Sequence, residues 1–460
     1  MEIKSGFESN YYDYIFKNKI IKNNSKGIDK KSFKSYSTKE EREKLYSAIN
    51  KKVQDKEYKF SPYLELLRVK KRNTSPRMIS IPTIRDKIVL TTLKSILHDL
   101  FPENINKEQP NSYINKIKNY IGANSNKELY FIKVDISQFY YNIKWDKLKK
   151  KLSQRITNKY YLRLIMEGIK TPTVPANYHK EDLHRYILKK GVPQGLPISN
   201  ILAQIYIQEL DIYCIKTFQS NSLYLRYVDD ILILTNNESI NHIEIIESQL
   251  KELGLKLNKD KTGHGKLSGE FDFLGYLISN NKVTIGKRTI ENQINKIAGK
   301  ITWFKKGIEN ESARPYKYKD ETKGFARQFI KEVNQIITGS KSSKKSYGWL
   351  FYYLEIDDLS VLYKMDKVIS SLIKDIPYFK NKVPKNLKKT SRAFAEIKYN
   401  NGGNYINDFD KIKTQSQMKK YLSEAAALDE KKEYTNEELE LAFINHREKL
   451  LKHLNENIVY

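Results

Sequence analysis

Four stretches of the chain repeat apolar residues at helical spacing, with polar residues between them. The pattern predicts helices with at least one apolar face over residues 86–101, 145–154, 200–215 and 240–253. Ser199 immediately precedes the third of these stretches, so it is a candidate N-cap. After residue 287 the chain is mostly helical and strongly basic, and a last helix is expected over residues 436–457.

Short apolar runs between these stretches predict strands and hairpins. Single strands are expected at residues 66–69, 78–81 and 129–136, and hairpins at residues 223–234 and 271–285. Asp135 lies near the end of one strand, and Asp229-Asp230 lies at the turn of the first hairpin. The second hairpin pairs residues 271–278 with 282–285 around Asn280-Asn281. This order predicts an α+β fold in which helices cover one face of an antiparallel sheet.

Charge and composition narrow the class of protein. The chain has 83 Lys and Arg against 54 Asp and Glu, a formal net charge of +29. Such an excess is typical of chains that bind a polyanion, although a Lys-rich composition accounts for part of it. The single cysteine, Cys214, excludes a disulfide framework and a Cys-rich zinc site and fits a reducing cytoplasm. No apolar run is long enough to predict a membrane span.

Three acidic residues predict a metal site. Joining nucleoside triphosphates into a polymer needs two divalent ions about 3.5–4 Å apart, held by a few carboxylates on a rigid support. Asp135 and Asp229-Asp230 could supply that arrangement with two Mg²⁺ ions, for which Mn²⁺ could substitute. An isolated Asp-Asp pair is most often a surface turn, but the apolar runs on both sides favour a buried hairpin with charge at its rim.

The motifs, taken in order, resemble those of reverse transcriptases. Tyr227-Val228-Asp229-Asp230 looks like the hallmark tetrad of the family, and residues 134–140 resemble its first palm motif. Residues 191–200 contain a similar Pro-Gln-Gly element, and residues 257–262 resemble the motif that follows the tetrad. Phe273-Leu274-Gly275-Tyr276 looks like the primer-grip hairpin. Five motifs in the correct order are far more specific than one acidic pair.

The resemblance implies an RNA-directed DNA polymerase with a right-hand fold. Composition shifts near residues 125, 287 and 385 divide that fold into four parts. These are an N-terminal extension with the fingers (1–125), the palm with part of the fingers (126–287), a helical basic thumb (288–385) and a helical C-terminal extension (386–460).

Roles at the reacting atoms follow from the same resemblance. Asp135 and Asp229 would bridge both metal ions, and Asp230 would assist them. Tyr140 would be a steric gate, because its ring would clash with a ribose 2′-hydroxyl and so favour dNTPs. Gln194 would line the incoming nucleotide.

Basic residues are implied to bind phosphates. Arg77, with Lys70 as a second candidate, would clamp the triphosphate, since a guanidinium suits bidentate phosphate contact. Lys261 would approach the pyrophosphate as a general acid, with Lys259 as the alternative. Lysines of the thumb would follow the nucleic-acid backbone: Lys296, Lys300, Lys305, Lys306 and the run from Lys341 to Lys345.

The subtype is indicated by further stretches. Residues 57–89, 348–359 and 405–410 are similar to the defence-associated reverse transcriptases of bacteria, the unknown-group enzymes related to the abortive-infection ones. That resemblance implies a role against phage, with a dedicated non-coding RNA as template or scaffold; a homo-oligomer is allowed. Val283-Thr284-Ile285-Gly286 departs from the Val-Thr-Gly element usual in retrons. A retron or intron type is the alternative.

Other interpretations of the same sequence assign the chain a different substrate, a different mode of priming or no catalysis. An RNA-dependent RNA polymerase would share the palm, but Tyr140 argues against it. A non-catalytic RNA-binding protein is disfavoured because all three Asp residues are present. Template-independent or protein-primed DNA synthesis would use the same site, with Tyr460 or Tyr405 as the candidate priming hydroxyl.

Overall fold

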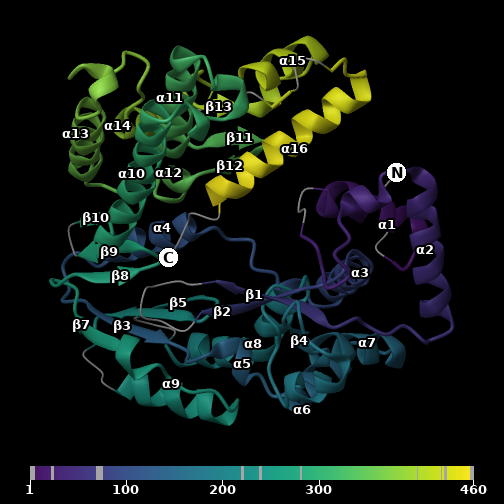
Figure 1. The fold of residues 1–460 in the computed structure, drawn as a ribbon. Coiled ribbons are helices and arrows are strands. Elements are labelled where there is room, and N and C mark those ends of the chain that lie inside the picture. Colours follow the sequence, from purple (N-terminus) through teal and green to yellow (C-terminus); the bar gives the residue numbers. More distant parts are fainter. Residues whose placement is uncertain are drawn as a thin grey trace. The chain divides into compact units, whose positions relative to one another are not determined.

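The structure, a computed structural model, divides the chain into two compact units. The first unit comprises Met1–Glu108 and Lys127–Gly265, and the second comprises Gln109–Asn126 and Lys266–Tyr460. The described residues are 6–21, 25–68, 76–218, 222–237, 241–279, 282–400, 402–425, 427–428 and 432–455. Each unit has its own strands and helices (Figure 1). The four-part division made from the sequence stays a prediction.

A four-stranded sheet lies in the first unit, with its strands in the order β5-β6-β3-β7. The strands are β3 (Tyr130–Asp135), β5 (Ser222–Tyr227), β6 (Asp230–Thr235) and β7 (Gly263–Lys266). Both β3 and β5 run antiparallel to β6. Residues 231–234 of β6 are fully buried, which is why this strand is a continuous apolar run rather than an alternating one.

Helices pack around this sheet and share one hydrophobic core with it. The four predicted helices are confirmed as α3 (Ile84–Leu100), α6 (Trp145–Ser153), α8 (Ser199–Thr217) and α9 (Asn241–Glu252). The unit also contains α1 (Ser9–Ile15), α2 (Lys39–Gln54), α5 (Phe139–Asn142) and α7 (Lys159–Lys170). The prediction that Ser199 caps α8 is wrong. Ser199 is the first residue of the helix, and its buried hydroxyl donates to the carbonyl of Pro193 instead.

A second, smaller sheet in the first unit has the order β2-β1-β4. Its strands are β1 (Tyr63–Arg68), β2 (Arg77–Ile81) and β4 (Thr173–Val174). The two predicted strands around the basic turn are confirmed as an antiparallel pair, in which Leu66 lies opposite Ile79. The turn itself, residues 69–75, lies outside the described residues.

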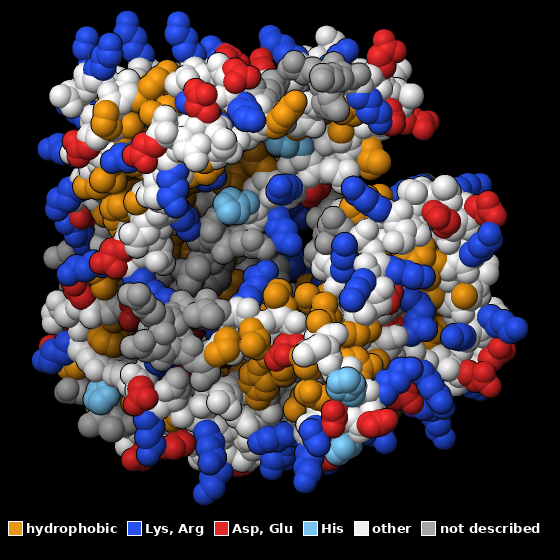
Figure 2. Space-filling view, viewed as in Figure 1, with side chains coloured by type: hydrophobic (Ala, Val, Ile, Leu, Met, Phe, Trp, Pro, Cys, Tyr) orange, Lys and Arg blue, Asp and Glu red, His pale blue; other side chains and the backbone are white. Residues whose placement is uncertain are grey.

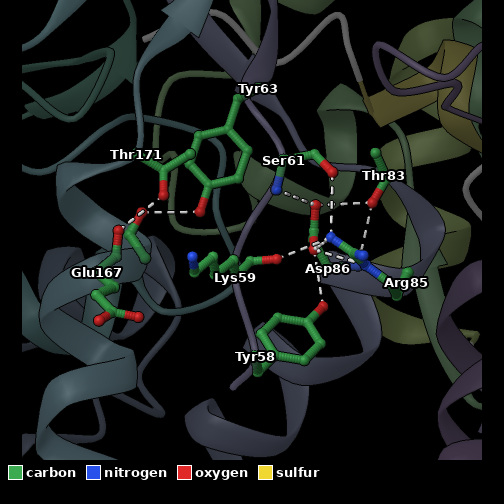
Figure 3. A network of polar contacts seen from close by, with 10 residues as sticks. Tyr58, Lys59, Ser61, Tyr63, Thr83, Arg85, Asp86, Glu167 and Thr171 are labelled. Carbon is green, nitrogen blue, oxygen red and sulfur yellow. Dashed lines mark hydrogen bonds and ion pairs between the residues drawn. The ribbon is translucent and has the colours of Figure 1, made fainter. Parts of the chain in front are cut away.

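A buried carboxylate ties this small sheet to α3 (Figure 3). Asp86, in the first turn of α3, is fully buried and accepts hydrogen bonds from the hydroxyls of Tyr58 (2.7 Å) and Thr83 (2.8 Å). It also accepts from the backbone N–H of Ser61 and from the guanidinium of Arg85 (2.9 Å). A buried charge is tolerated only when it is paired and fully hydrogen-bonded, and these partners meet that condition. The network therefore fixes the segment before β1 against the start of α3.

In the second unit, residues 271–285 form a three-stranded antiparallel sheet with the order β10-β9-β8. Its strands are β8 (Phe271–Phe273), β9 (Tyr276–Ser279) and β10 (Lys282–Ile285). The prediction of one strand over residues 271–278 is wrong, because Leu274 and Gly275 both have positive φ (49° and 79°) and turn the chain. The predicted turn at Asn280-Asn281 lies outside the described residues.

Helices make up most of the second unit. They are α4 (Pro110–Ala123), α10 (Lys287–Glu309), α11 (Thr322–Thr338), α12 (Trp349–Tyr352), α13 (Ser360–Lys374), α14 (Thr390–Tyr399), α15 (Gln415–Glu424) and α16 (Asn436–Asn455). Aromatic rings pack between α10 and α11, where Phe304 stacks on Phe329 with centroids 4.4 Å apart. A third sheet has the order β12-β11-β13, with β11 (Ser340–Ser342), β12 (Lys345–Tyr347) and β13 (Asn407–Asp408).

The C-terminal residues complete this third sheet. β13 pairs in parallel with β11, and the carboxylate of Asp410 accepts hydrogen bonds from the backbone N–H groups of Ser343 and Lys344. Both of these turn residues have positive φ, so the β11–β12 turn depends on a partner for its N–H groups. Residues after 386 therefore belong to the same packed unit as α10 and α11.

Among the described residues, no helix combines the length and the apolar composition that crossing a membrane requires.

We expect replacement of Asp86 by Ala to lower the free energy of unfolding by about 3 kcal/mol, because it leaves the hydroxyls of Tyr58 and Thr83 without this acceptor and the Arg85 guanidinium without its carboxylate partner. Chemical denaturation of the purified chain measures this loss. The control Glu40→Ala removes an exposed ion pair with Lys44 within α2 and should change stability little. Equal effects of the two substitutions would contradict the role given to Asp86.

Candidate active site

The sheet of the first unit brings the three predicted acidic residues together. Asp135, the last residue of β3, lies directly opposite Asp230, the first residue of β6. Asp229 occupies the turn before β6, and its carbonyl accepts a hydrogen bond from the N–H of Ile136 (3.1 Å). Two segments about a hundred residues apart in sequence are thus held side by side through backbone pairing.

Asp135 is held by two side chains of the segment 257–262. Its Oδ1 accepts from Nδ2 of Asn258 (3.0 Å), and its Oδ2 pairs with Nζ of Lys261 (2.8 Å). The backbone N–H of Asn258 also donates to the carbonyl of Asp135. Both lysines proposed from the sequence are exposed, and Lys261 is the one that pairs with Asp135. The sequence reasoning passed over Asn258, although it lies within the motif that drew attention to Lys261.

The carboxylates perturb one another. Burial, and then the charge of Asp135, raises the pKa of Asp229. Burial, followed by the charges of Asp229 and Asp135, raises the pKa of Asp230 to about 6. Negative groups that raise each other's pKa in this way gain when a cation lies between them. The donor set therefore fits a divalent, oxygen-preferring metal ion.

The described residues nevertheless include no group of three or more His, Cys, Asp or Glu side chains arranged as a ready-made metal cage. This agrees with the chemistry of Mg²⁺, which takes one or two carboxylates and fills its remaining positions with water and substrate phosphates. The carboxylate of Asp135 is also already paired with the ammonium of Lys261, which accounts for the lack of a ready-made cage at that residue.

Tyr140 lies beside the acidic group. It belongs to α5, which begins after Gln138, a residue with left-handed φ (46°) that turns the chain sharply at the end of β3. The carbonyl of Tyr140 accepts from the N–H of Val192 (2.8 Å). Burial and the nearby charge of Asp229 raise the pKa of its phenol to about 12, so the ring is neutral at physiological pH.

The Pro-Gln-Gly segment lies against β2. The carbonyl of Gln194 accepts from the N–H of Ser80 (2.7 Å). Gly195 has φ of +101°, and a Cβ there would come within 2.6 Å of Ile79 and 2.9 Å of the Ser80 carbonyl. Only glycine allows this close approach without displacing β2.

Of the two residues proposed for triphosphate binding, one can be placed. Arg77, the first residue of β2, is exposed and lies close enough to Asp229 and Tyr140 for its charge to offset part of the rise in their pKa values. Lys70 lies outside the described residues.

Residues 69–278 match the protein family described as "Reverse transcriptase (RNA-dependent DNA polymerase)". This region of the chain is therefore similar to reverse transcriptases. The match covers all three acidic residues, Tyr140 and the Pro-Gln-Gly segment. The predicted α+β class is confirmed. The assignment of the sheet that carries the acids to a polymerase palm stays a prediction.

The curated relatives of the chain are distant. The putative COX1/OXI3 intron 2 protein of Saccharomyces cerevisiae is 24% identical over 295 residues, covering 50% of this chain and 33% of that protein. Protein YkfC of Escherichia coli is 21% identical over 270 residues, covering 49% of this chain and 69% of YkfC. The chain therefore spans about a third of the length of the yeast protein.

Among solved structures, the telomerase of Candida albicans in complex with a fragment of telomeric RNA is similar at a TM-score of 0.41 and 15% identity. That similarity covers 86% of this chain and 69% of the telomerase chain. It is too distant to assign residues.

The predicted primer-grip residues lie in the second unit. Phe273 ends β8, Leu274 and Gly275 form the turn, and Tyr276 begins β9. The hydroxyl of Tyr352 donates to the carbonyl of Leu274 (2.8 Å), so α12 supports this turn.

The lysines of the predicted thumb differ in their surroundings. Burial lowers the pKa of Lys296 to about 8, and Lys300 pairs with Glu332 (2.5 Å). Lys305 and Lys306 are exposed.

Figure 2 shows Lys and Arg side chains spread over the face of the molecule that it draws, with fewer Asp and Glu between them. The net charge of +29 is therefore not confined to one tail.

Of the two candidate priming tyrosines, the structure describes Tyr405. Tyr405 is half-buried, its ring lies under Lys388 and Arg392, and its hydroxyl accepts from the N–H of Lys389 (2.8 Å). Burial raises the pKa of its phenol, which makes the nucleophilic phenolate scarcer. Tyr460 lies outside the described residues. The priming role of either residue stays a prediction.

We expect Asp230→Asn to stabilise the metal-free protein at pH 7, on the order of 1–3 kcal/mol, because it removes a charge that is buried beside two others. The folded pKa of Asp230, about 6, lies above the ordinary value of 3.8. The folded chain therefore holds this proton more tightly than the unfolded chain, and wild-type stability falls as the pH rises between these two values.

Thermal unfolding with and without Mg²⁺ measures the effect. The stability gain should shrink as Mg²⁺ is added, since the ion offsets the same repulsion in the wild type. Asp146→Asn, a change at an exposed carboxylate on α6, is the control. A variant that is less stable than the wild type without metal would contradict the assigned repulsion.

Proposed function

We propose that this chain is an RNA-directed DNA polymerase that copies an RNA template into DNA by two-metal nucleotidyl transfer. One observation carries the proposal: Asp135 faces Asp230 across a β-ladder, with Asp229 in the adjoining turn, inside the region that matches the reverse-transcriptase family. This places three carboxylates at one end of a rigid, buried sheet, as the chemistry requires.

In this proposal, Asp135, Asp229 and Asp230 hold two Mg²⁺ ions, or Mn²⁺ in their place. When bound, these ions lower the pKa of the attacking hydroxyl and neutralise the leaving pyrophosphate. Lys261 carries its ammonium at the same carboxylate group, where it can protonate the leaving pyrophosphate. Arg77 provides a further positive charge for the triphosphate.

Tyr140 selects the sugar in this proposal. Its backbone is fixed by the hydrogen bond from Val192, which precedes Gln194 by two residues. Its phenol is close enough to Asp229 to feel the charge of that residue. A ring held between the Gln194 segment and the metal ligands would occupy the space that a ribose 2′-hydroxyl needs.

The wider setting rests on the motif resemblance rather than on this geometry. We propose a cytoplasmic role in bacterial defence against phage, with a dedicated non-coding RNA, because residues 57–89 and 348–359 are similar to the defence-associated enzymes. The yeast relative is named as an intron protein, which favours the intron type as the second candidate. Assaying phage resistance and RNA splicing in cells that express the chain separates the two.

We expect the double substitution Asp229→Ala and Asp230→Ala to reduce DNA synthesis to background while RNA binding stays within about threefold, since RNA affinity comes mainly from basic residues. Primer extension with dNTPs on an RNA template measures synthesis, and filter binding measures affinity. Synthesis that persists in this variant would exclude the assigned metal ligands, and an inactive wild type would exclude the function.

We expect Tyr140→Ala to raise incorporation of NTPs relative to dNTPs by about tenfold or more, the order expected when one steric misfit is removed. Tyr140→Phe keeps the ring and is the matched control, which should preserve the wild-type preference. Single-nucleotide extension with each substrate gives the ratio of kcat/KM values. If the Ala variant kept the wild-type ratio, Tyr140 would not be the gate.

A further inference from the structure

The turn that carries Asp229 has an unusual backbone. Val228 has φ of 59°, in the left-handed region that a β-branched residue rarely adopts. Such a conformation is strained and persists only where the surrounding structure imposes it. Val228 directly precedes Asp229, so any relaxation of its backbone would redirect the carboxylates that follow.

The side chain of Arg226 binds this turn directly. Its Nη1 donates to the carbonyl of Val228 (2.9 Å), two residues further along the same hairpin. The side chain is only 8% exposed, so the guanidinium is removed from solvent and its bonds are little weakened by water.

Helix α8 holds the guanidinium in place. Nε and Nη2 of Arg226 donate to the two carboxylate oxygens of Asp211, the first at 2.6 Å, in a bidentate pair. Nη2 also donates to Oε1 of Gln204 (2.8 Å), and the hydroxyl of Tyr224 donates to Asp211 (2.9 Å). Every one of these partners restricts the guanidinium to one orientation, the one that reaches Val228.

The same helix begins at the nucleotide side of the site. The Ser199 hydroxyl at the start of α8 donates to the carbonyl of Pro193, next to Gln194. Asp211 and Gln204 lie further along this helix. One rigid element therefore connects the Pro-Gln-Gly segment with the turn of Asp229.

The geometry points to Arg226 as a positioning residue of the polymerase site: through Asp211 and Gln204 it holds the Val228 turn in its left-handed conformation and so sets the position of Asp229. This inference rests on the proposed function. In physical terms, the hydrogen bond from Arg226 to the Val228 carbonyl, called the clamp below, offsets the backbone strain of a valine at positive φ.

The test compares Arg226→Lys in two backgrounds, wild type and Val228→Gly. Lysine keeps the charge but cannot hold Asp211, Gln204 and the Val228 carbonyl together. In the wild-type background, we expect Arg226→Lys to lower kcat of primer extension about 100-fold, the order expected when a reacting group is misplaced by about 1 Å. The dNTP KM should stay nearly unchanged. Mn²⁺ binding, followed by electron paramagnetic resonance without substrate, should weaken in parallel.

Glycine at position 228 adopts positive φ without strain and should make the clamp dispensable. In the Val228→Gly background, Arg226→Lys should therefore lower kcat by less than about tenfold. Asp211→Asn, which removes the bidentate acceptor, should reproduce the loss seen with Arg226→Lys in each background. Thermal unfolding of every variant checks that the fold is retained.

The matched control is Arg155→Lys. Arg155 also pairs with a carboxylate, Glu103 (2.7 Å), and donates to a carbonyl, that of Leu100 (2.8 Å), but does not reach the turn. Its substitution should leave kcat and Mn²⁺ binding unchanged.

Equal losses of kcat and of Mn²⁺ affinity in the two backgrounds, or no loss from Arg226→Lys in either, would overturn the inference. A wild-type chain that makes no DNA would instead overturn the proposed function. In that case Mn²⁺ binding still tests the clamp, because Arg226→Lys should weaken Mn²⁺ binding in the wild-type background and not in the Val228→Gly background.

Discussion

Three carboxylates that repel one another are held together by a β-ladder, and the rest of the first unit depends on that constraint. Burial and mutual repulsion raise the pKa of Asp229 and Asp230, so the acids would separate if their backbones could move. Pairing of β3 with β6 prevents this, because residues 231–234 of β6 are fully buried and cannot shift without disturbing the core. The site thus stores electrostatic repulsion that a divalent ion would relieve.

Precise placement in this site comes from backbone conformations that few residues adopt readily. Gln138, Val228 and Gly195 all have positive φ. Gln138 and Val228 lie in the turns next to Asp135 and Asp229, and Gly195 lies against β2. The two residues that are not glycine need support from outside their own turn. Arg226 supplies it at Val228, and the packing of α5 against the Val192 segment supplies it near Gln138.

The second unit shows the same dependence on distant partners. The turn of the predicted primer grip is supported by Tyr352 of α12, some eighty residues later. The basic β11–β12 turn is supported by Asp410, in the C-terminal extension. The extension therefore contributes to the fold of the unit that contains the predicted thumb, whatever further role it has.

The sequence alone determined the elements whose burial is uniform along their length. Helix α8 and strand β6 were predicted correctly because their apolar residues give a strong periodic or continuous signal, and the five ordered motifs indicated the acidic site. Only the tertiary structure decided how residues distant in sequence meet: the register that places Asp135 opposite Asp230, and the contact of Lys261 rather than Lys259 with Asp135. It also showed the turn within residues 271–278 and the failure of Ser199 to cap α8. The physical reason is that periodicity reports burial, which is local to an element. Turn conformation, hydrogen-bond partners and charge pairing depend instead on which other segment packs alongside.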